Sequence, residues 1–288
     1  MKLSVIIPCY NVASTIAIQL EALASQKWSQ PWEVIVVDNK STDNTVAIAE
    51  LFKQKIPSLR IIDAKAKQGA AYARNVGASV AKAEALAFCD ADDEVAPGWV
   101  AAMGEALAKY DFVTGRSLHD KLNEPWVVTN YGSPDGFCIV ENPYLPFAIS
   151  CNIGVKRSVH QSVGGFDENF VMIEDIDYSW CIQEKGIQIQ QLPEAIVHYR
   201  LRKNLKMVCQ RSWGVGIYEA LLYKKHKNYG IPKILMSWKS FIKTPLEFVL
   251  EVASFKVRDI DAIAKWMCTL AWRAGQLLGC LKFGYLPI

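Results

Sequence analysis

The amino-acid sequence predicts an α/β protein: a doubly wound, mostly parallel sheet flanked by helices, with a C-terminal helical extension. Short apolar runs alternate with amphipathic segments over the first 200 residues. Such alternation is typical of parallel sheets. From about Leu201 onward the pattern is helical, and the sign of the net charge changes. We therefore expect two domains, residues 1–200 and residues 201–288.

The expected elements follow from hydrophobic periodicity and from turn residues. The expected strands are residues 3–7, 33–37, 59–63, 85–89, 111–115, 151–155 and 187–191. The expected helices are residues 14–27, 41–54, 69–82, 98–110 and 175–185. Residues 119–146 are rich in Pro, Gly, Asn and aromatic residues, and we expect irregular or short antiparallel structure there.

Charge is distributed unevenly along the chain. Residues 1–199 hold 16 lysines and arginines against 24 acidic residues, a net charge of −8, whereas residues 200–288 hold 16 against 5, a net charge of +11. Such asymmetry indicates a separate task for the basic part, with nucleic acid, anionic lipid or a phosphorylated ligand as candidate partners. No recognised nucleic-acid motif accompanies the charge, so we expect no nucleic acid as partner.

Cysteine usage and the N-terminus both predict a cytoplasmic protein. The eight cysteines form no Cys-x-x-Cys pair, and several lie in apolar runs, which favours reduced thiols. The apolar segment after Lys2 is too short for a secretory signal. No uncharged apolar stretch reaches 18 residues, because Arg273 interrupts the longest one.

The clearest chemical signal is the sequence Asp90-Ala91-Asp92-Asp93, which directly follows a continuous apolar run. Such a run suits a buried parallel strand, and open α/β sheets bind ligands at the C-terminal ends of their strands. Two aspartates one residue apart can turn toward one hard cation, Mg²⁺ or Mn²⁺. The alternative is an ordinary turn in which an aspartate caps the next helix.

Further candidate residues also have structural alternatives, and for a lone histidine the structural alternative is the commoner one. Asp38 follows the second strand and is either a nucleotide contact or a turn residue. Arg74 can reach a phosphate, brace carboxylates or be exposed. Glu174, Asp175 and Asp177 lie near a helix start, where acidic residues favour the helix dipole, but one of them can serve as a general base. His198 ends an apolar run and is of interest only if it faces Asp92.

Taken together, these segments resemble the GT-A-fold family-2 glycosyltransferases from Met1 to about Tyr199. The resemblance rests on the order and spacing of several short motifs. They are Val5-Ile6-Ile7-Pro8-Cys9-Tyr10-Asn11, Val36-Val37-Asp38-Asn39-Lys40-Ser41-Thr42-Asp43-Asn44-Thr45, residues 69–77, Asp90-Ala91-Asp92-Asp93, Gly164-Gly165-Phe166-Asp167-Glu168 and Glu174-Asp175.

The resemblance implies transfer of a sugar from a nucleotide-sugar, by default a UDP-sugar, with inversion at the anomeric carbon and with Mg²⁺ or Mn²⁺ as cofactor. It implies roles for the residues at the nucleotide site, where Asp38 would bind the base and Arg74 would lie near the diphosphate. The implied nucleotide-site residues are Pro8, Tyr10, Asn11, Asp38, Arg74 and Asp90.

The same resemblance implies that Asp92 binds the metal directly, that Asp90 contacts ribose or metal-bound water, and that His198 is a late metal ligand. It implies that Asp175, within the Glu174-Asp175 pair, is the base that takes the acceptor proton. The acceptor side would then be formed by Gly165, Phe166, Asp167 and Glu168.

Two departures from the family pattern stand out. The Gln-x-x-Arg-Trp motif of processive synthases is missing, since residues 210–213 read Gln-Arg-Ser-Trp, and this favours transfer of a single sugar to a glycan or lipid-linked acceptor. Ile173 stands where the family usually has Gly before the Glu-Asp pair.

The basic extension carries apolar residues at helical spacing. It is either a lid packed on the catalytic domain or a peripheral attachment to anionic lipid at the inner face of the cell membrane. Two other functions remain open: a sugar nucleotidyltransferase, which would normally carry a Gly-rich loop after the first strand, and an inactive homologue acting as a membrane or partner adaptor.

Overall fold

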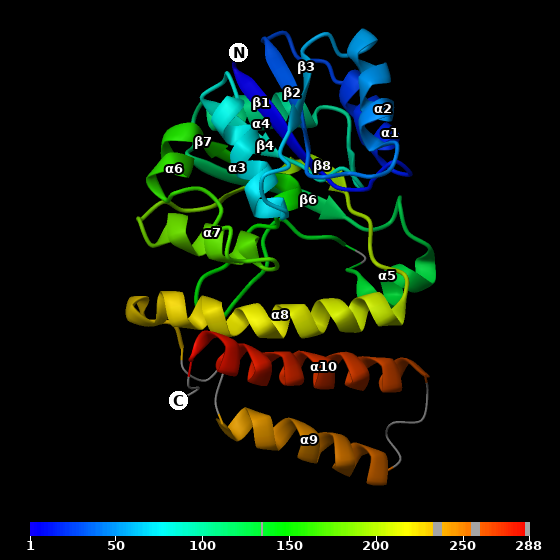
Figure 1. The fold of residues 1–288 in the computed structure, drawn as a ribbon, viewed down its shortest axis with the longest axis vertical. Coiled ribbons are helices and arrows are strands. Elements are labelled where there is room, and N and C mark those ends of the chain that lie inside the picture. The colour runs from blue at the N-terminus through cyan, green and yellow to red at the C-terminus, as the bar shows by residue number, and fades with distance from the viewer. Residues whose placement is uncertain (134, 233–237, 255–259, 286–288) are drawn as a thin grey trace. The chain divides into compact units, whose positions relative to one another are not determined.

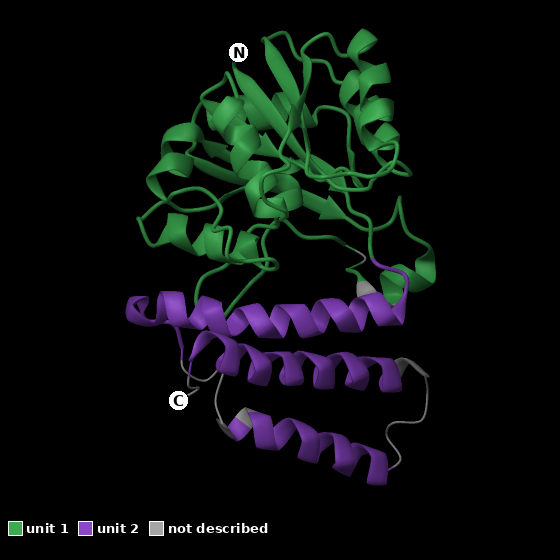
Figure 2. Cartoon of the chain, in the orientation of Figure 1, with its two compact units in different colours: residues 1–201 green, residues 202–288 purple. Residues whose placement is uncertain are grey.

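The computed structural model describes residues 1–133, 135–232, 238–254 and 260–285. The chain divides into two compact units, Met1–Leu201 and Arg202–Ile288 (Figure 2). We call them unit 1 and unit 2.

An eight-stranded mixed sheet forms the centre of unit 1 (Figure 1), in the order β3-β2-β1-β4-β7-β6-β8-β5. Its strands are β1 (Leu3–Cys9), β2 (Trp32–Asp38), β3 (Leu59–Asp63), β4 (Ala85–Phe88), β5 (Glu94–Val95), β6 (Phe112–Leu118), β7 (Ile153–Lys156) and β8 (Gln190–His198). Strands β1 to β4 pair in parallel, as the sequence predicts.

Strand β7 makes the mostly parallel sheet a mixed one, because it runs antiparallel to both β4 and β6. Two successive reversals restore the direction, so β6 runs the same way as β4. Strand β8 is parallel to β6. The C-terminal ends of β1, β2, β4 and β8 therefore lie at one edge of the sheet, which we call the C-terminal edge.

Helices cover both faces of the sheet. The helices of unit 1 are α1 (Ile16–Ala24), α2 (Thr45–Leu51), α3 (Ala70–Val80), α4 (Trp99–Leu107), α5 (Pro125–Tyr131), α6 (Arg157–Ser162) and α7 (Glu174–Gln183). Alternate residues of β1 enter two separate cores: Val5 and Ile7 pack with residues of α1 and α4, while Ile6 packs with residues of α3. This period of two with cover on both faces defines the doubly wound arrangement.

The structure differs from the sequence prediction at several places, and three of them bear on the site. A helix, α5, forms within the segment expected to be irregular, and it begins with Pro125 at its first turn, where a missing amide hydrogen costs nothing. The last strand, β8, spans residues 190–198 instead of 187–191, so His198 ends this same strand. Helix α4 begins only at Trp99, after Gly98 with a φ of 88°.

Unit 2 consists of α8 (Leu205–His226), α9 (Trp238–Ala253) and α10 (Ile260–Phe283), with a short 3-10 turn at Lys227–Tyr229. Helices α8 and α10 pack closely through glycines: a Cβ on Gly275 would lie 2.2 Å from the Trp213 carbonyl oxygen, and one on Gly279 2.3 Å from that of Ile217. Helix α9 joins α10 through the rings of Phe248 and Trp266, 5.3 Å apart. Within the described ranges, none of the helices is both long and apolar enough to cross a membrane.

Candidate active site

Three carboxylates gather just after β4 at the C-terminal edge. Oxygens of Asp90, Asp92 and Asp93 lie within 4.8 Å of one another. The segment is held from α1, because Gln19 donates to the Asp90 carbonyl oxygen (2.9 Å) and accepts from the Val95 amide (2.9 Å). The aspartates predicted from the sequence are thus brought together, and their loop is fixed by a buried amide side chain.

Asp93 is the buried member of this cluster. It is 1% exposed, and its Oδ1 accepts the backbone N–H of Arg200 at 2.8 Å. Arg200 also donates through Nε to the Asp92 carbonyl oxygen at 2.8 Å. Burial raises the pKa of Asp93, and the charges of Asp92 and Asp90 raise it further. Its Oδ2 is buried and has no hydrogen-bond partner among the described residues, which makes the neighbourhood of Asp93 favourable for a positive charge.

Arg74 links this cluster to the start of α7. Its side chain is 3% exposed and donates from Nη2 to Asp90 (2.7 Å) and from Nη1 to Glu174 (2.8 Å). Burial alone would lower the pKa of the guanidinium, but Asp90 and Glu174 more than offset this and raise it. Of the sequence interpretations left open for Arg74, this geometry favours the brace between carboxylates.

The start of α7 presents two carboxylates in different environments. Glu174 is buried, and burial raises its pKa, although the nearby Arg74 opposes that shift. Asp175 is half-buried, and it accepts from the Ser150 amide at 3.4 Å and from the Ile176 amide at 2.9 Å. Asp175 therefore remains accessible, whereas Glu174 anchors the helix start to Arg74.

Backbone geometry explains the unusual residue before this pair. Ile173 has a φ of 58°, in the left-handed region that glycine occupies at no steric cost. A β-branched residue is strained there. The position thus has the conformation for which the family usually uses Gly.

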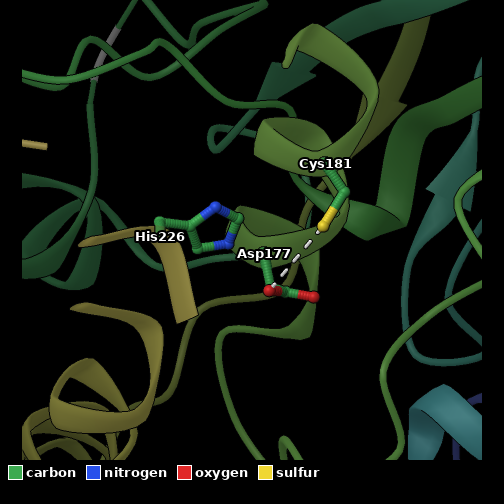
Figure 3. Close-up of side chains that lie close together, drawn as sticks. All are labelled: Asp177, Cys181 and His226. Atoms are coloured by element: carbon green, nitrogen blue, oxygen red, sulfur yellow. Dashed lines mark hydrogen bonds between the residues drawn. The ribbon is translucent and has the colours of Figure 1, made fainter. Parts of the chain in front are cut away.

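The third acidic residue of this helix is directed inward. Asp177 is 1% exposed and accepts a long contact from the Cys181 thiol, 4.0 Å away and one turn along α7 (Figure 3). Asp177 is therefore a structural residue of α7 and is not part of the carboxylate pair formed by residues 174 and 175.

On the nucleotide side, Asp38 is buried at the end of β2, and its Oδ1 accepts the Ser41 amide at 3.2 Å. Tyr10 is 49% exposed, and Pro8 is half-buried at the end of the neighbouring β1. Asn11 has a φ of 52°, and its Oδ1 accepts the Thr42 amide at 2.7 Å. Asn11 thus fixes the loop after β2 against the loop after β1.

The segment 164–168 is anchored to α3 by Asn75. The Asn75 amide accepts from the Phe166 N–H (2.9 Å), donates to the Phe166 carbonyl (2.8 Å) and donates to Glu168 (3.1 Å). Gly165 has a φ of 76°, and a Cβ there would lie 2.6 Å from the Asn75 oxygen. Phe166 is 1% exposed and stacks on Tyr178 at 4.0 Å, so this ring supports the loop from the core. Asp167 accepts from the Asn169 amide at 3.0 Å.

His198 lies opposite Glu94 in the pairing of β8 with β5. Its neighbours Tyr199 and Arg200 are tied down, since Tyr199 donates to the Leu118 carbonyl (2.8 Å) and Arg200 to Asp93. Burial lowers the pKa of His198, and Lys121 adds to this, so the ring is neutral near pH 7. The ring is not a member of the carboxylate cluster, and its Nδ1 lies 3.8 Å from Asp120.

Sequence reasoning missed the amide side chains that position the site. Gln19, Asn39 and Asn75 are each hydrogen-bonded to backbone groups far along the chain; Asn39, for example, donates to the Lys67 carbonyl (2.7 Å) and accepts from the Gly69 amide (2.8 Å). For Asn39 and Asn75 a signal existed, because each follows directly on a candidate residue, Asp38 or Arg74. For Gln19, an amide on a helix, no such signal exists.

The fold and site define a class of protein, and sequence comparison agrees. Residues 4–164 match the family model "Glycosyl transferase family 2", and the chain belongs to this family. Its fold is GT-A-like. The chain is 44% identical over 96 residues to the uncharacterized glycosyltransferase YibD of Escherichia coli K12. The matched segment covers 33% of this chain and 27% of that relative.

A longer match relates the chain to chondroitin synthase of Escherichia coli, with 24% identity over 262 residues. It covers 77% of this chain and 38% of that enzyme, so the chain spans less than half the length of these two relatives.

Solved structures share the fold. The mannosyltransferase PcManGT of Pyrobaculum calidifontis, in complex with GDP-Man and Mn²⁺, superposes with a TM-score of 0.66 and 17% identity, covering 98% of this chain and 87% of that one. TarS 1–349 of S. aureus, in complex with UDP-GlcNAc, superposes with a TM-score of 0.56 and 17% identity, covering 99% of this chain and 93% of that one.

Proposed function

We propose that this glycosyltransferase moves a single sugar from a nucleotide-sugar to a hydroxyl acceptor, with inversion at the anomeric carbon and with a divalent cation. The observation that best supports the proposal is the continuous set of contacts from the carboxylates after β4, through Arg74, to the Glu174-Asp175 pair. A departing diphosphate requires positive charge, and an acceptor hydroxyl requires a base. Groups suited to each requirement meet at the C-terminal edge.

Asp92 and Asp90 are the residues proposed to hold Mg²⁺ or Mn²⁺, with His198 as a further ligand. The three neighbouring carboxylates fit such an ion, because hard divalent cations prefer oxygen ligands, and the buried Asp93 oxygen without a hydrogen-bond partner favours positive charge nearby. When bound, the cation supplies charge that stabilises the leaving diphosphate. Arg74 keeps Asp90 oriented for this task, since their contact is buried on the arginine side.

Asp175 is proposed to take the proton from the acceptor hydroxyl. It is the accessible carboxylate of the pair, and the amides of Ser150 and Ile176 fix its orientation. Glu174 assists by holding the helix start against Arg74. A direct displacement requires one base on the side opposite the leaving group, so no covalent intermediate is needed. The loop with Gly165, Phe166, Asp167 and Glu168 is proposed to border the acceptor side, and Asn75 anchors it through Phe166 and Glu168.

The donor nucleotide is proposed to lie over Pro8, Tyr10, Asn11 and Asp38, where two loops are joined by hydrogen bonds at the ends of β1 and β2. Asp38 suits recognition of a base, since a carboxylate accepts the imino and amino hydrogens of nucleobases. We propose UDP as the nucleotide. TarS, a structural neighbour, binds UDP-GlcNAc, whereas PcManGT binds GDP-Man, so guanine is the competing outcome.

The acceptor is proposed to be a glycan or a lipid-linked glycan, and the enzyme to attach peripherally to the inner face of the cell membrane through unit 2. Helix α9 supports this attachment because it has two apolar faces. Phe241 and Phe248 lie on the side that contacts α10. The other face is exposed and follows the spacing i, i+4, i+7, i+8 of one helical stripe, with the residues Ile242, Leu246, Val249 and Leu250. An exposed apolar stripe on a basic unit is typical of helices at anionic interfaces.

A panel of UDP-, GDP- and dTDP-sugars tests the proposed reaction. We expect slow donor hydrolysis with one sugar, dependent on Mg²⁺ or Mn²⁺ and abolished by chelation. Release of pyrophosphate from a nucleoside triphosphate and a sugar phosphate would instead identify a nucleotidyltransferase. Donor binding without any turnover across the panel, with acceptor extracts added, would support the inactive adaptor.

A further inference from the structure

Two of the eight free cysteines face each other across unit 2. Cys209 on α8 and Cys268 on α10 have their Sγ atoms 3.1 Å apart, and both side chains are half-buried. The proposed reaction uses neither residue. They lie 59 positions apart in the chain, so their approach is a property of the helix packing.

Backbone contacts explain why these two thiols meet. Gly275 of α10 faces the carbonyl of Trp213 on α8. One turn further along both helices, Gly279 faces the carbonyl of Ile217. The two helices therefore run in the same direction in a fixed register, and their backbones touch where glycines leave room. Cys209 lies one turn before Trp213, and Cys268 lies two turns before Gly275, so both fall on the same helix–helix seam.

The surroundings of Cys268 make its thiol a weak acid. Burial, followed by the contact with Cys209, raises the pKa of Cys268 to about 11, so this thiol is protonated at neutral pH. Since the thiolate is the reactive form, Cys268 is a weak first nucleophile, and we infer that an oxidant reacts first with Cys209. Cys268 then completes the bond from an adjacent position, with the two Sγ atoms 3.1 Å apart, which gives it a large advantage over a thiol from solution.

We propose that Cys209 and Cys268 are a redox-sensitive pair that forms an intramolecular disulfide between α8 and α10, with a low-molecular-weight disulfide as the oxidant. The Cys209 thiolate attacks oxidised glutathione, which gives a mixed disulfide and releases one glutathione thiolate. The Cys268 thiol loses its proton and attacks the Cys209 sulfur, which releases the second glutathione. Overall, two protein thiols are oxidised and one glutathione disulfide is reduced to two thiols.

The bond would close a loop that contains α9 and would hold α10 in register on α8. Separation of α8 from α10 then requires reduction first. In a reducing compartment the pair is open, and oxidation closes it reversibly, as expected for cysteines that are partly accessible.

Non-reducing peptide mapping of the full-length protein tests this site. After treatment with oxidised glutathione and capping of the remaining thiols, trypsin should release residues 207–211 linked to residues 266–273, two hydrogens lighter than the two separate peptides. We expect this linked peptide in at least tenfold excess over any other cysteine pair, faster formation at pH 8.5 than at pH 7, and complete loss on treatment with a dithiol.

Cys209→Ser should abolish the link and leave Cys268 almost unmodified, and Cys280→Ser, the matched control on α10, should preserve it. A thermal midpoint that rises on oxidation in the wild type, but not in Cys209→Ser, would show that the bond stabilises the folded chain. Stable glutathione adducts on Cys209 with no linked peptide would refute the proposal, as would equal cross-linking among all eight cysteines. These results are independent of glycosyl transfer, so the proposed activity can fail without affecting them.

Discussion

The C-terminal edge of the sheet in unit 1 and the helices of unit 2 use polar and apolar residues in opposite ways. At the sheet edge the polar groups are buried, and partners from distant parts of the chain hold them: Arg74 with Glu174, and Asp93 with Arg200. In unit 2 much of the apolar surface is exposed, as on α9, where Ile242 is 72% exposed. At the sheet edge, the polar groups are held in place by other residues of the same unit. In unit 2, apolar side chains are left exposed, and such a surface suits an external partner.

The largest expected effect falls on the carboxylate cluster. Asp92→Asn should reduce transfer at least a thousandfold and abolish cation-dependent nucleotide binding, because an amide is a poor ligand and carries no charge. Activity assays with Mn²⁺ and circular dichroism check this, with the fold expected to be unchanged.

Asp63→Asn is the matched control, since Asp63 is an exposed aspartate at the end of β3, the edge strand that pairs with β2. It should leave activity within twofold of the wild type. Near-normal turnover in Asp92→Asn would remove the metal site from the proposal.

Asp175→Asn should lower kcat by a factor of about 10²–10⁴ and leave the donor Kd within about twofold, since a general base acts in the transition state. Steady-state kinetics and calorimetry with the donor separate the two quantities. Asp177→Asn is the comparison, because Asp177 is buried in the same helix. An equal loss of donor affinity in Asp175→Asn would assign Asp175 a structural role.

The role proposed for the exposed apolar surface of unit 2 is tested by measuring attachment to membranes. Full-length protein should sediment with anionic vesicles, less so at high salt, because each basic residue near the surface contributes about 1 kcal/mol. Leu246→Gln with Leu250→Gln should weaken binding about tenfold or more, whereas Leu51→Gln, at an exposed position of α2, should not. Truncation near Gly230 should abolish binding. A protein that ignores anionic vesicles at low salt would make unit 2 a packing element and the acceptor a soluble molecule.

Much of the C-terminal edge was predictable from the sequence, because its residues carry signals that are local in the chain. Asp38, Asp90 and His198 each end an apolar run, and strand direction places such ends at one edge once the strands are known. The antiparallel insertion of β7 was not predictable, because pairing partners are not encoded in a four-residue strand. Nor was the burial of Arg74 between Asp90 and Glu174, which depends on residues 100 positions apart.

A smaller effect is expected on the affinity for the nucleotide. Asp38→Ala should raise the Kd for UDP about tenfold, the equivalent of one charge-assisted hydrogen bond. Calorimetry at fixed Mn²⁺ measures it, and Asp43→Ala, in the same loop, is the control for a change in loop structure, because Asp43 accepts the Ala13 and Thr45 amides. Unchanged affinity in Asp38→Ala would leave Asp38 as a turn residue that caps the Ser41 amide.

The smallest expected effect concerns a polar cluster inside unit 2. Glu219 on α8 accepts from Trp272 (2.8 Å) and Gln276 (2.6 Å) on α10. Burial raises the pKa of Glu219 to about 7, against the opposing influence of those two hydrogen bonds and of Arg273. Between about pH 4.5 and pH 7 the unfolded chain loses this proton while the folded chain retains it, so stability falls as pH rises through this window and is constant above it.

Glu219→Gln should remove that slope. Relative to the wild type it should stabilise the chain at pH 8 by about 1 kcal/mol, below the full shift because the carboxylate is only partly buried. Urea denaturation at pH 5, 6, 7 and 8 measures the difference, and Glu247→Gln, at an exposed ion pair with Lys243, should keep the wild-type slope. If Glu219→Gln and the wild type show parallel pH profiles, the hydrogen bonds from α10 hold Glu219 ionised in the folded chain.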